Sequence, residues 1–321
     1  MTKLLLLQKL KNDDLKEVRD NFPDLELLTA DQMTDDLVDQ IEILYGQFSK
    51  GQGLDPWFEK LVHGGKSLKW IQMISAGIDF LPLAELAKRG VIVSNMSGLH
   101  SEAISENVLA YMLIFNRGLK KALENQAKQV WDLGLTGIKQ LQNKKIVIFG
   151  TGAIGSAVAK ILQGFDVTVI GVNRHGTELP YFQQVITHSQ LDQVADADYL
   201  ISDMPLTDMT RGYFDSSFFH LFKNKPIFIN VGRGPSVVEK DLISALKDET
   251  LSAAALDVVE HEPLDADSPL WQMENVIITP HSSALIEHYY KKSYQIFGPN
   301  LKSYLTTGKL AINQVSLKEG Y

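Results

Sequence analysis

The chain of 321 residues is long enough for about two domains, and its 45% hydrophobic and 22% charged residues are typical of folded globular proteins. A formal net charge of −8, with no long cluster of Lys and Arg, argues against nucleic acid or an anionic membrane as a partner. There is no Cys, which excludes disulfides, thiolate nucleophiles and Cys-based zinc sites, and we expect no metal.

The N-terminal sequence MTKLLLLQKLKNDD has only a four-Leu apolar run before charged residues resume. This run is too short for a signal peptide or for a helix that spans a membrane. We therefore expect a cytoplasmic protein.

Short apolar runs rich in Val and Ile recur along the chain, with helical stretches between them. They predict strands at 4–7, 41–45, 70–74 and 91–94, then at 145–149, 167–172, 199–202, 226–231, 253–258 and 276–279. Alternation of strand and helix predicts parallel sheets. The expected fold class is α/β, with two doubly wound parallel-sheet lobes, the second a Rossmann dinucleotide-binding domain.

The boundary between the lobes is expected near Gly98, where a turn leads into an apolar-periodic helix at 101–116. A second helix at 284–305 is expected to return to the first lobe. The predicted domains are a flavodoxin-like substrate-binding domain at 1–100 plus 286–321 and a dinucleotide-binding domain at 101–285.

The clearest local motif is KIVIFGTGAIG at 145–155, an apolar strand that runs into G-x-G-x-x-G and then into a helix. The first glycine permits a tight turn, the second lets backbone amides approach a pyrophosphate, and the third lets helix and strand pack closely. The helix N-terminus then faces the phosphates. The expected cofactor contacts in this motif are Gly150, Gly152, Ala153, Ile154 and Gly155.

The second strand of such a unit usually ends in an acid that binds the ribose 2′-hydroxyl of NAD. Here it ends in Asn173 and Arg174. A carboxylate would repel a 2′-phosphate, whereas Arg174 can pair with one through charge-assisted hydrogen bonds. NADP(H) is therefore favoured as cofactor, and NAD(H) stays open, because Arg174 could also be a solvated loop residue.

Three later strands end in polar residues, where ligands gather outside the carboxyl ends of a parallel sheet. One strand end carries Arg233 between two glycines, which suggests close approach of a ligand. The next leads from Asp257 to Glu262, and the last ends at His281. Together they offer a cation, carboxylates and an imidazole.

These motifs make the chain resemble the D-isomer-specific 2-hydroxyacid dehydrogenases over about 68–284. The matching words are SAGID at 75–79, GTGAIG, MPLT at 204–207, NVGRG at 230–234, LDVVEHEP at 256–263 and TPH at 279–281. The resemblance implies a cofactor in the middle segment, a homodimer, and catalysis by Arg233, Glu262 and His281.

The chemistry of these residue types agrees with that implication. Reduction of a 2-oxo acid needs a hydride at the keto carbon and a proton at the developing alkoxide. His281 can give the proton, with Glu262 favouring the imidazolium, while Arg233 suits a carboxylate. His261 competes with His281 for this role, and Arg233 could instead be a structural ion-pair partner of Glu262.

The resemblance also implies secondary contacts. Ala76 and Gly77 would bind the substrate carboxylate. Arg233 and His281 would also contact the substrate. Asp257 would hold the nicotinamide carboxamide. The rest of the cofactor wall would be Pro205, Val231 and Gly232. Trp131 could close a substrate pocket or anchor an interface, and Asp203 has no assigned role.

The favoured function is an oxidoreductase that reduces a small 2-oxo acid to a D-2-hydroxy acid with NAD(P)H, similar to glyoxylate/hydroxypyruvate reductases. Ser282 and Ser283 follow His281 in place of the aromatic pair of the D-lactate dehydrogenase branch, which disfavours pyruvate. Two alternatives stay open: a nucleotide-sensing, corepressor-like binding protein without catalysis, and a phosphite- or formate-type dehydrogenase of the same superfamily.

Overall fold

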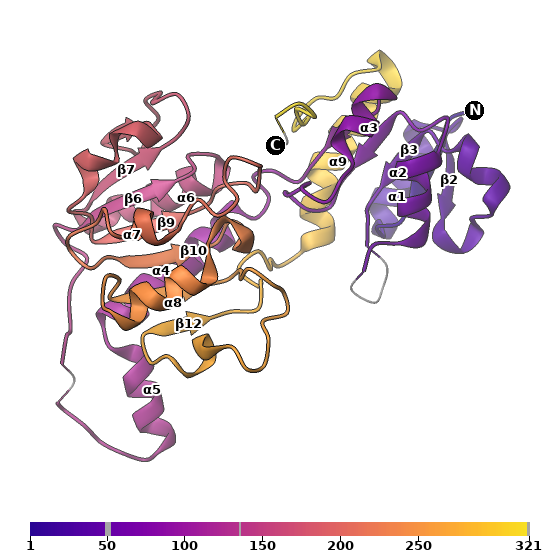
Figure 1. Ribbon diagram of the computed structural model, residues 1–321. Helices are drawn as coiled ribbons and strands as arrows, with labels where there is room; N and C mark the ends of the chain where they lie inside the picture. The colour runs from indigo at the N-terminus through magenta and orange to yellow at the C-terminus, as the bar shows by residue number, and fades with distance from the viewer. Residues whose placement is uncertain (49–52, 135, 320–321) are drawn as a thin grey trace. The chain divides into compact units, whose positions relative to one another are not determined.

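The computed structural model describes residues 1–48, 53–134 and 136–319, and the chain divides into two compact units (Figure 1). Unit 1 comprises Met1–Leu99 and Ile286–Tyr321, and unit 2 comprises His100–Leu285. Each unit is built on one parallel sheet covered by helices. The predicted α/β class with two parallel-sheet lobes is confirmed.

Unit 1 holds a five-stranded sheet in the order β2-β1-β3-β4-β5, in which every neighbouring pair is parallel. Its strands are β1 (Lys3–Leu6), β2 (Glu26–Thr29), β3 (Ile43–Tyr45), β4 (Trp70–Gln72) and β5 (Ile92–Ser94). Its helices are α1 (Asn12–Asn21), α2 (Pro56–Gly64), α3 (Leu83–Lys88) and α9 (Tyr289–Thr307). The edge strand β2 was not predicted.

The last helix, α9, is part of the core of unit 1. Its Phe297 stacks on Tyr45, with ring centroids 4.1 Å apart, and lies 5.8 Å from the ring of Trp70. The helix was expected to begin near residue 284, but it begins at Tyr289, because His288 has a left-handed backbone with φ of 57°. None of the helices in the described ranges is both long and apolar enough to cross a membrane.

Unit 2 holds a seven-stranded parallel sheet in the order β12-β11-β10-β9-β6-β7-β8. Its strands are β6 (Lys145–Phe149), β7 (Thr168–Val172), β8 (Gln184–Ile186), β9 (Tyr199–Ser202), β10 (Ile227–Asn230), β11 (Ala253–Leu256) and β12 (Val276–Ile278). Its helices are α4 (Ser101–Asn116), α5 (Leu119–Ala127), α6 (Ala153–Ile161), α7 (Ser216–Phe219) and α8 (Glu239–Lys247). The edge strand β8 was not predicted.

The strand order of unit 2 determines where a ligand can bind. The chain builds β6, β7 and β8 toward one edge, then starts again on the other side of β6 with β9 and continues to β12. In open parallel sheets, ligands bind at such a reversal, outside the carboxyl ends of the strands. The loops after β6 and β9 flank this position.

Apolar residues on both faces of the sheet in unit 2 form its core. One face carries Val147, Phe149 and Phe228, and the other carries Ile146, Ile148 and Ile229. The alternation along β6 and β10 shows why these strands read as continuous apolar runs, since both faces are covered. The rigid sheet therefore fixes the positions of the loops at its carboxyl edge.

Candidate active site

The glycine-rich turn after β6 has the geometry that dinucleotide binding requires. Gly150 has φ of +100°, and a Cβ there would lie 2.7 Å from the Asp203 carbonyl oxygen, so only glycine fits. At Gly155 a Cβ would lie 2.0 Å from the Gly150 carbonyl oxygen. At Gly152, in contrast, a Cβ would meet nothing within 4 Å. That open space lies at the N-cap of α6, where helix amides favour an anion.

The residues present therefore fit a bound diphosphate. Ala153 and Ile154 are the first residues of α6, so their amides belong to the group that has no acceptor within the helix. Pro205 follows β9, and Val231 and Gly232 follow β10, so all three lie at the same carboxyl edge of the sheet. Their contact with a cofactor stays a prediction.

The loop after β7 uses Asn173 to hold its own shape. The Asn173 side chain donates to the Thr151 hydroxyl at 2.9 Å, and its oxygen accepts from the amides of His175 at 3.0 Å and Gly176 at 2.8 Å. Arg174 is exposed, and its charge helps to lower the pKa of His188, second to burial of that imidazole. A positive charge therefore lies beside the Rossmann turn where an acid would favour NAD.

Arg233 lies in a tightly braced turn directly after β10. The buried Asn230 side chain donates to the Arg233 carbonyl at 3.2 Å and accepts from the Gly232 amide at 3.2 Å. The Ser236 hydroxyl also donates to the Arg233 carbonyl, at 2.6 Å. This bracing fixes the backbone from which the guanidinium extends, and Nη1 donates to the Gly232 carbonyl at 2.9 Å.

The glycines on either side of Arg233 are required by close packing against other parts of the backbone. A Cβ at Gly232 would lie 2.8 Å from the Met204 carbonyl oxygen, and one at Gly234 would lie 1.7 Å from the Val259 carbonyl oxygen. Both distances are far below contact distance. Close approach of neighbouring backbone, rather than of a ligand, is sufficient to explain these two glycines.

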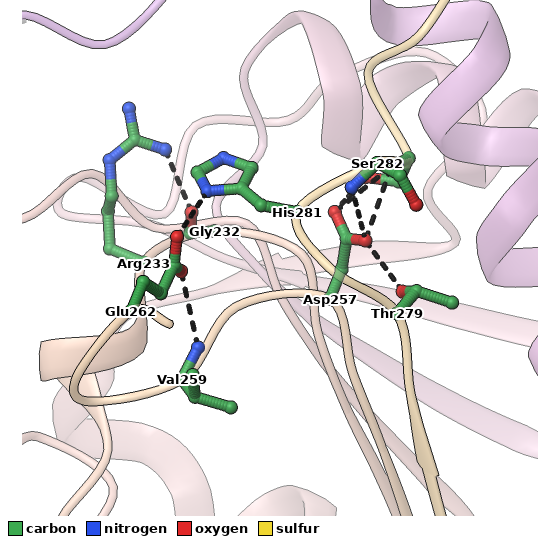
Figure 2. A network of polar contacts seen from close by, with 9 residues as sticks. Gly232, Arg233, Asp257, Val259, Glu262, Thr279, His281 and Ser282 are labelled. Atoms are coloured by element: carbon green, nitrogen blue, oxygen red, sulfur yellow. Dashed lines mark hydrogen bonds and ion pairs between the residues drawn. The ribbon is translucent and has the colours of Figure 1, made fainter. Parts of the chain in front are cut away.

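Glu262 and His281 form a hydrogen-bonded pair, as Figure 2 shows. The His281 Nδ1 lies 2.8 Å from Glu262 Oε2, and the other carboxylate oxygen accepts from the Val259 amide at 3.4 Å. Glu262 raises the pKa of His281 through this hydrogen bond, against the opposing effects of burial and of the Arg233 charge. The imidazole therefore keeps a proton at higher pH than an isolated histidine.

His261, the competing histidine, is not the partner of Glu262 in this pair. It is exposed, and its charge acts on Glu239 on the neighbouring helix α8. The electrostatic influence of Arg233 on His281 shows that the guanidinium and the imidazole face a common region. The structure thus brings the three predicted catalytic side chains together.

The Asp257 carboxylate organises the turn that carries His281 (Figure 2). It accepts from the Thr279 hydroxyl at 2.6 Å, the Ser282 amide at 3.0 Å and the Ser283 amide at 3.2 Å, and also from the Ser283 hydroxyl. His281 itself has a left-handed φ of 51°. Such a backbone is unfavourable for a non-glycine residue, so these hydrogen bonds hold His281 in place.

The role of Asp257 toward a nicotinamide stays a prediction, but its role in the turn is visible. The Tyr111 hydroxyl on α4 extends the same network, 2.7 Å from the Thr279 hydroxyl. Sequence reasoning missed Tyr111, Thr279 and Ser283 as supporting residues. For Thr279 and Ser283 the available signal was the run of mostly polar residues at 279–283 directly after β12.

Ala76 and Gly77 lie in unit 1, in the loop that follows β4. The Asn95 side chain donates to the Ala76 carbonyl at 2.6 Å, and the Ser75 hydroxyl donates to the Gly77 carbonyl at 2.8 Å. Within the described ranges, neither the Ala76 amide nor the Gly77 amide has an acceptor. The loop is thus held by its carbonyls while its amides can receive an anion, and the predicted contact with substrate stays a prediction.

Comparison with known proteins assigns the middle of the chain to a family. Residues 109–283 match the model of the D-isomer specific 2-hydroxyacid dehydrogenase NAD-binding domain. Glyoxylate/hydroxypyruvate reductase B of Yersinia pestis bv. Antiqua (strain Nepal516) is 32% identical over 268 residues, which are 82% of this chain and 77% of that protein.

Two solved structures extend the likeness over nearly the whole chain. Phosphoglycerate dehydrogenase from Lactobacillus plantarum is 37% identical, with a TM-score of 0.58 and coverage of 98% of this chain and 100% of that one. A probable 2-hydroxyacid dehydrogenase from Rhizobium etli CFN 42, in complex with NADP, is 25% identical. Its TM-score is 0.80, with coverage of 100% of this chain and 99% of that one.

Proposed function

Because the chain belongs to the D-isomer specific 2-hydroxyacid dehydrogenase family, we propose that it reduces a small 2-oxo acid to the D-2-hydroxy acid with NADPH. The family consists of NAD(P)-dependent oxidoreductases, so the reaction class follows from membership. The substrate and the preferred cofactor are our proposal. The observation that carries it is the Glu262–His281 pair beside Arg233, at the carboxyl edge of the sheet that bears the glycine-rich turn.

His281 is the proton donor in this proposal. Because Nδ1 is held by Glu262, the remaining nitrogen, Nε2, presents a proton to the substrate oxygen. The Glu262 carboxylate stabilises the imidazolium and fixes the direction of the ring. Loss of the proton leaves a neutral imidazole that is still hydrogen-bonded to Glu262, ready to be protonated again from water.

Arg233 binds and polarises the substrate. Its guanidinium is charged at all relevant pH values and can form two parallel hydrogen bonds to a carboxylate. A guanidinium beside the keto oxygen also stabilises the negative charge that develops there. When bound, reduced nicotinamide supplies the hydride to the keto carbon. A substrate must therefore carry a carboxylate next to a carbonyl, as small 2-oxo acids do.

NADPH is the proposed hydride donor because of the loop after β7. No carboxylate follows this strand at the position of Asn173, whose side chain is used in hydrogen bonds to Thr151 of the glycine-rich turn and to the Gly176 amide of its own loop. Arg174 adds a positive charge that suits a 2′-phosphate. The relative from Rhizobium etli, which was crystallised with NADP, supports the same choice.

An Arg174→Asp variant tests this choice of cofactor. We expect its preference to move toward NADH by about tenfold or more, because one good ion pair to a phosphate is lost and repulsion is added. The measurement is the ratio of kcat/KM for NADPH and NADH. An unchanged ratio would remove Arg174 from the argument and leave NAD(H) equally acceptable.

We also propose that the protein is a homodimer. Beyond α5, which projects from unit 2 in Figure 1, the chain presents Trp131 and Leu133 with exposed fractions of 90% and 88%. Val130 and, within α5, Leu123 are also exposed apolar residues. Large exposed apolar side chains that gather on one segment are typical of a surface that another chain covers. A second copy of this chain is the proposed occupant.

The reductase proposal is tested by absorbance of reduced nicotinamide with purified protein. NADPH and NADH are offered in parallel with glyoxylate, hydroxypyruvate, 3-phosphohydroxypyruvate and branched 2-oxo acids. Oxidation that depends on one of these acids is the expected result, and the best acid identifies the substrate. Tight nucleotide binding without turnover of any acid would support the nucleotide-sensing alternative instead. Turnover of phosphite or formate with NAD would support the other alternative, a phosphite- or formate-type dehydrogenase.

A further inference from the structure

Asp203 is an acidic residue placed directly against the glycine-rich turn. It follows β9, and its backbone amide donates to the Phe149 carbonyl at the end of β6, at 2.8 Å. Its carboxylate oxygen Oδ2 accepts from the amide of Gly155 at 3.1 Å. The residue is partly buried, and its backbone packs against Gly150 of the turn and Gly232 of the loop after β10. The fold accounts for this one oxygen, which caps a first-turn amide of α6, and the proposed catalysis does not use the acid.

The Gly155 amide belongs to the first turn of α6, the part of the helix that attracts anions. A carboxylate and a diphosphate would therefore compete for the same positive end of one helix. Two anions at one helix end repel each other, and the repulsion is stronger where burial removes water. If the Asp203 carboxylate kept its negative charge, it would weaken binding of any dinucleotide diphosphate at this turn.

The surroundings of Asp203 already favour the protonated, uncharged form of its carboxyl group. Burial raises the pKa of Asp203 to about 8, and this effect outweighs the hydrogen bond from Gly155 and the charge of Arg233, which both lower it. Arg233, from the loop after β10, is the charged group that acts on Asp203, and the turn after β6 contributes backbone amides. Near neutral pH the group is therefore mostly the neutral acid.

We infer that Asp203 binds the cofactor diphosphate as a neutral acid, so that a dinucleotide is taken up together with one proton at this residue. In this form one oxygen still accepts from the Gly155 amide, and the other donates its O–H to a phosphate oxygen. The inference rests on the dinucleotide binding of the proposed function. It adds a cofactor-binding residue and a defined protonation state.

Binding of the diphosphate changes the titration of Asp203 in one direction. The diphosphate disfavours the charged form of Asp203, so the pKa rises further when dinucleotide binds. Below the pKa of the free protein no proton is exchanged at Asp203 and affinity is constant. Above it the free protein must first bind a proton, so Kd rises by about tenfold per pH unit. NADH is the better probe, because it lacks a 2′-phosphate that titrates in the same range.

The test is calorimetry of NADH binding to the intact protein at about pH 9 and about pH 6.5, in two buffers with different heats of ionisation. The variants are Asp203→Asn, whose amide can accept from Gly155 and donate to phosphate, and Asp192→Asn, which removes an exposed acid from the same unit. The wild-type protein and Asp192→Asn are expected to take up close to one proton at the higher pH. Asp203→Asn is expected to take up none, with a Kd that stays nearly constant.

Proton uptake that persists in folded Asp203→Asn would overturn the inference, and so would a wild-type protein that binds NADH with no proton uptake at about pH 9. The wild-type measurement needs no variant, so it tests the inference even if Asp203→Asn does not fold. Proton-linked NADH binding without turnover of any 2-oxo acid would uphold the role of Asp203 and contradict the reductase. Absence of binding of both NADH and NADPH would overturn both.

Discussion

At the scale of single residues, the proposed reduction depends on a proton held by His281. We expect His281→Ala to reduce kcat by about 10²–10⁴, the range typical of a lost general acid, with little change in NADPH affinity. The measurements are steady-state reduction of the best 2-oxo acid and fluorescence titration of NADPH. His261→Ala is the matched control and should retain nearly full activity, because His261 lies toward Glu239. A His281→Ala enzyme that turns over normally would invalidate the assignment.

Glu262 sets the pH range in which His281 is charged. Since Glu262 raises the pKa of His281, the reactive imidazolium is present below that pKa and is lost as pH rises through it. Reduction should therefore be constant at low pH and fall at high pH. In Glu262→Gln the fall should begin at lower pH, because the stabilising carboxylate is absent. The pH profile of kcat/KM checks this, and coinciding profiles for the two proteins would contradict it.

The three catalytic candidates could be predicted because their motifs resemble those of the family, and because each motif follows a strand at the edge where parallel strands present polar residues. The supporting contacts of Asp257 and Asp203 could not. They depend on which backbone amides come within about 3 Å of a carboxylate, such as those of Ser282 and Gly155. That distance is decided by turn conformation, and one sequence carries no direct signal for it.

At the scale of elements, the turn from β6 to α6 contains glycines that the fold requires and one, Gly152, that only the proposed cofactor contact requires. Gly155→Ala would drive a Cβ to 2.0 Å from the Gly150 carbonyl oxygen, whereas Gly152→Ala meets nothing within 4 Å. We expect Gly155→Ala to lower the free energy of unfolding by about 1–3 kcal/mol, the usual cost of overpacking. Gly152→Ala should leave stability unchanged and weaken NADPH binding. Thermal unfolding and titration of NADPH measure the two effects.

Two outcomes would contradict these predictions. A Gly155→Ala protein as stable as wild type would show that helix and strand can separate without cost. A Gly152→Ala protein with normal NADPH affinity would show that the open space at the N-cap of α6 does not receive the cofactor.

The strands missed from the sequence are β2 and β8, two of the four edge strands. Their apolar runs are only two residues long, at 27–28 and 185–186, whereas the predicted edge strands β5 and β12 lie in runs of three, at 91–93 and 276–278. The helix at 101–116 was predicted correctly because its apolar residues repeat with helical spacing on a buried face. The start of α9 depends on a single left-handed residue, His288, which no periodicity reveals.

At the scale of the whole molecule, exposed apolar residues after α5 lead us to expect a dimer. Light scattering should give twice the mass of the 35.8 kDa chain. Leu133→Asp should shift the mass toward that of one chain, because it places a charge in the covered surface. Asp132→Asn, next to it, is the matched control and should stay dimeric. A wild-type mass of one chain at all concentrations would contradict the proposal.

The central claim is that a hydride moves from reduced nicotinamide to the carbonyl carbon of a 2-oxo acid while His281 protonates the oxygen. The most direct test uses NADPH with deuterium at both C4 positions and the best acid of the panel. Our account predicts a product with one deuterium at C2 and only the D configuration, as D-isomer specificity requires. A product without deuterium, or a racemic one, would contradict it.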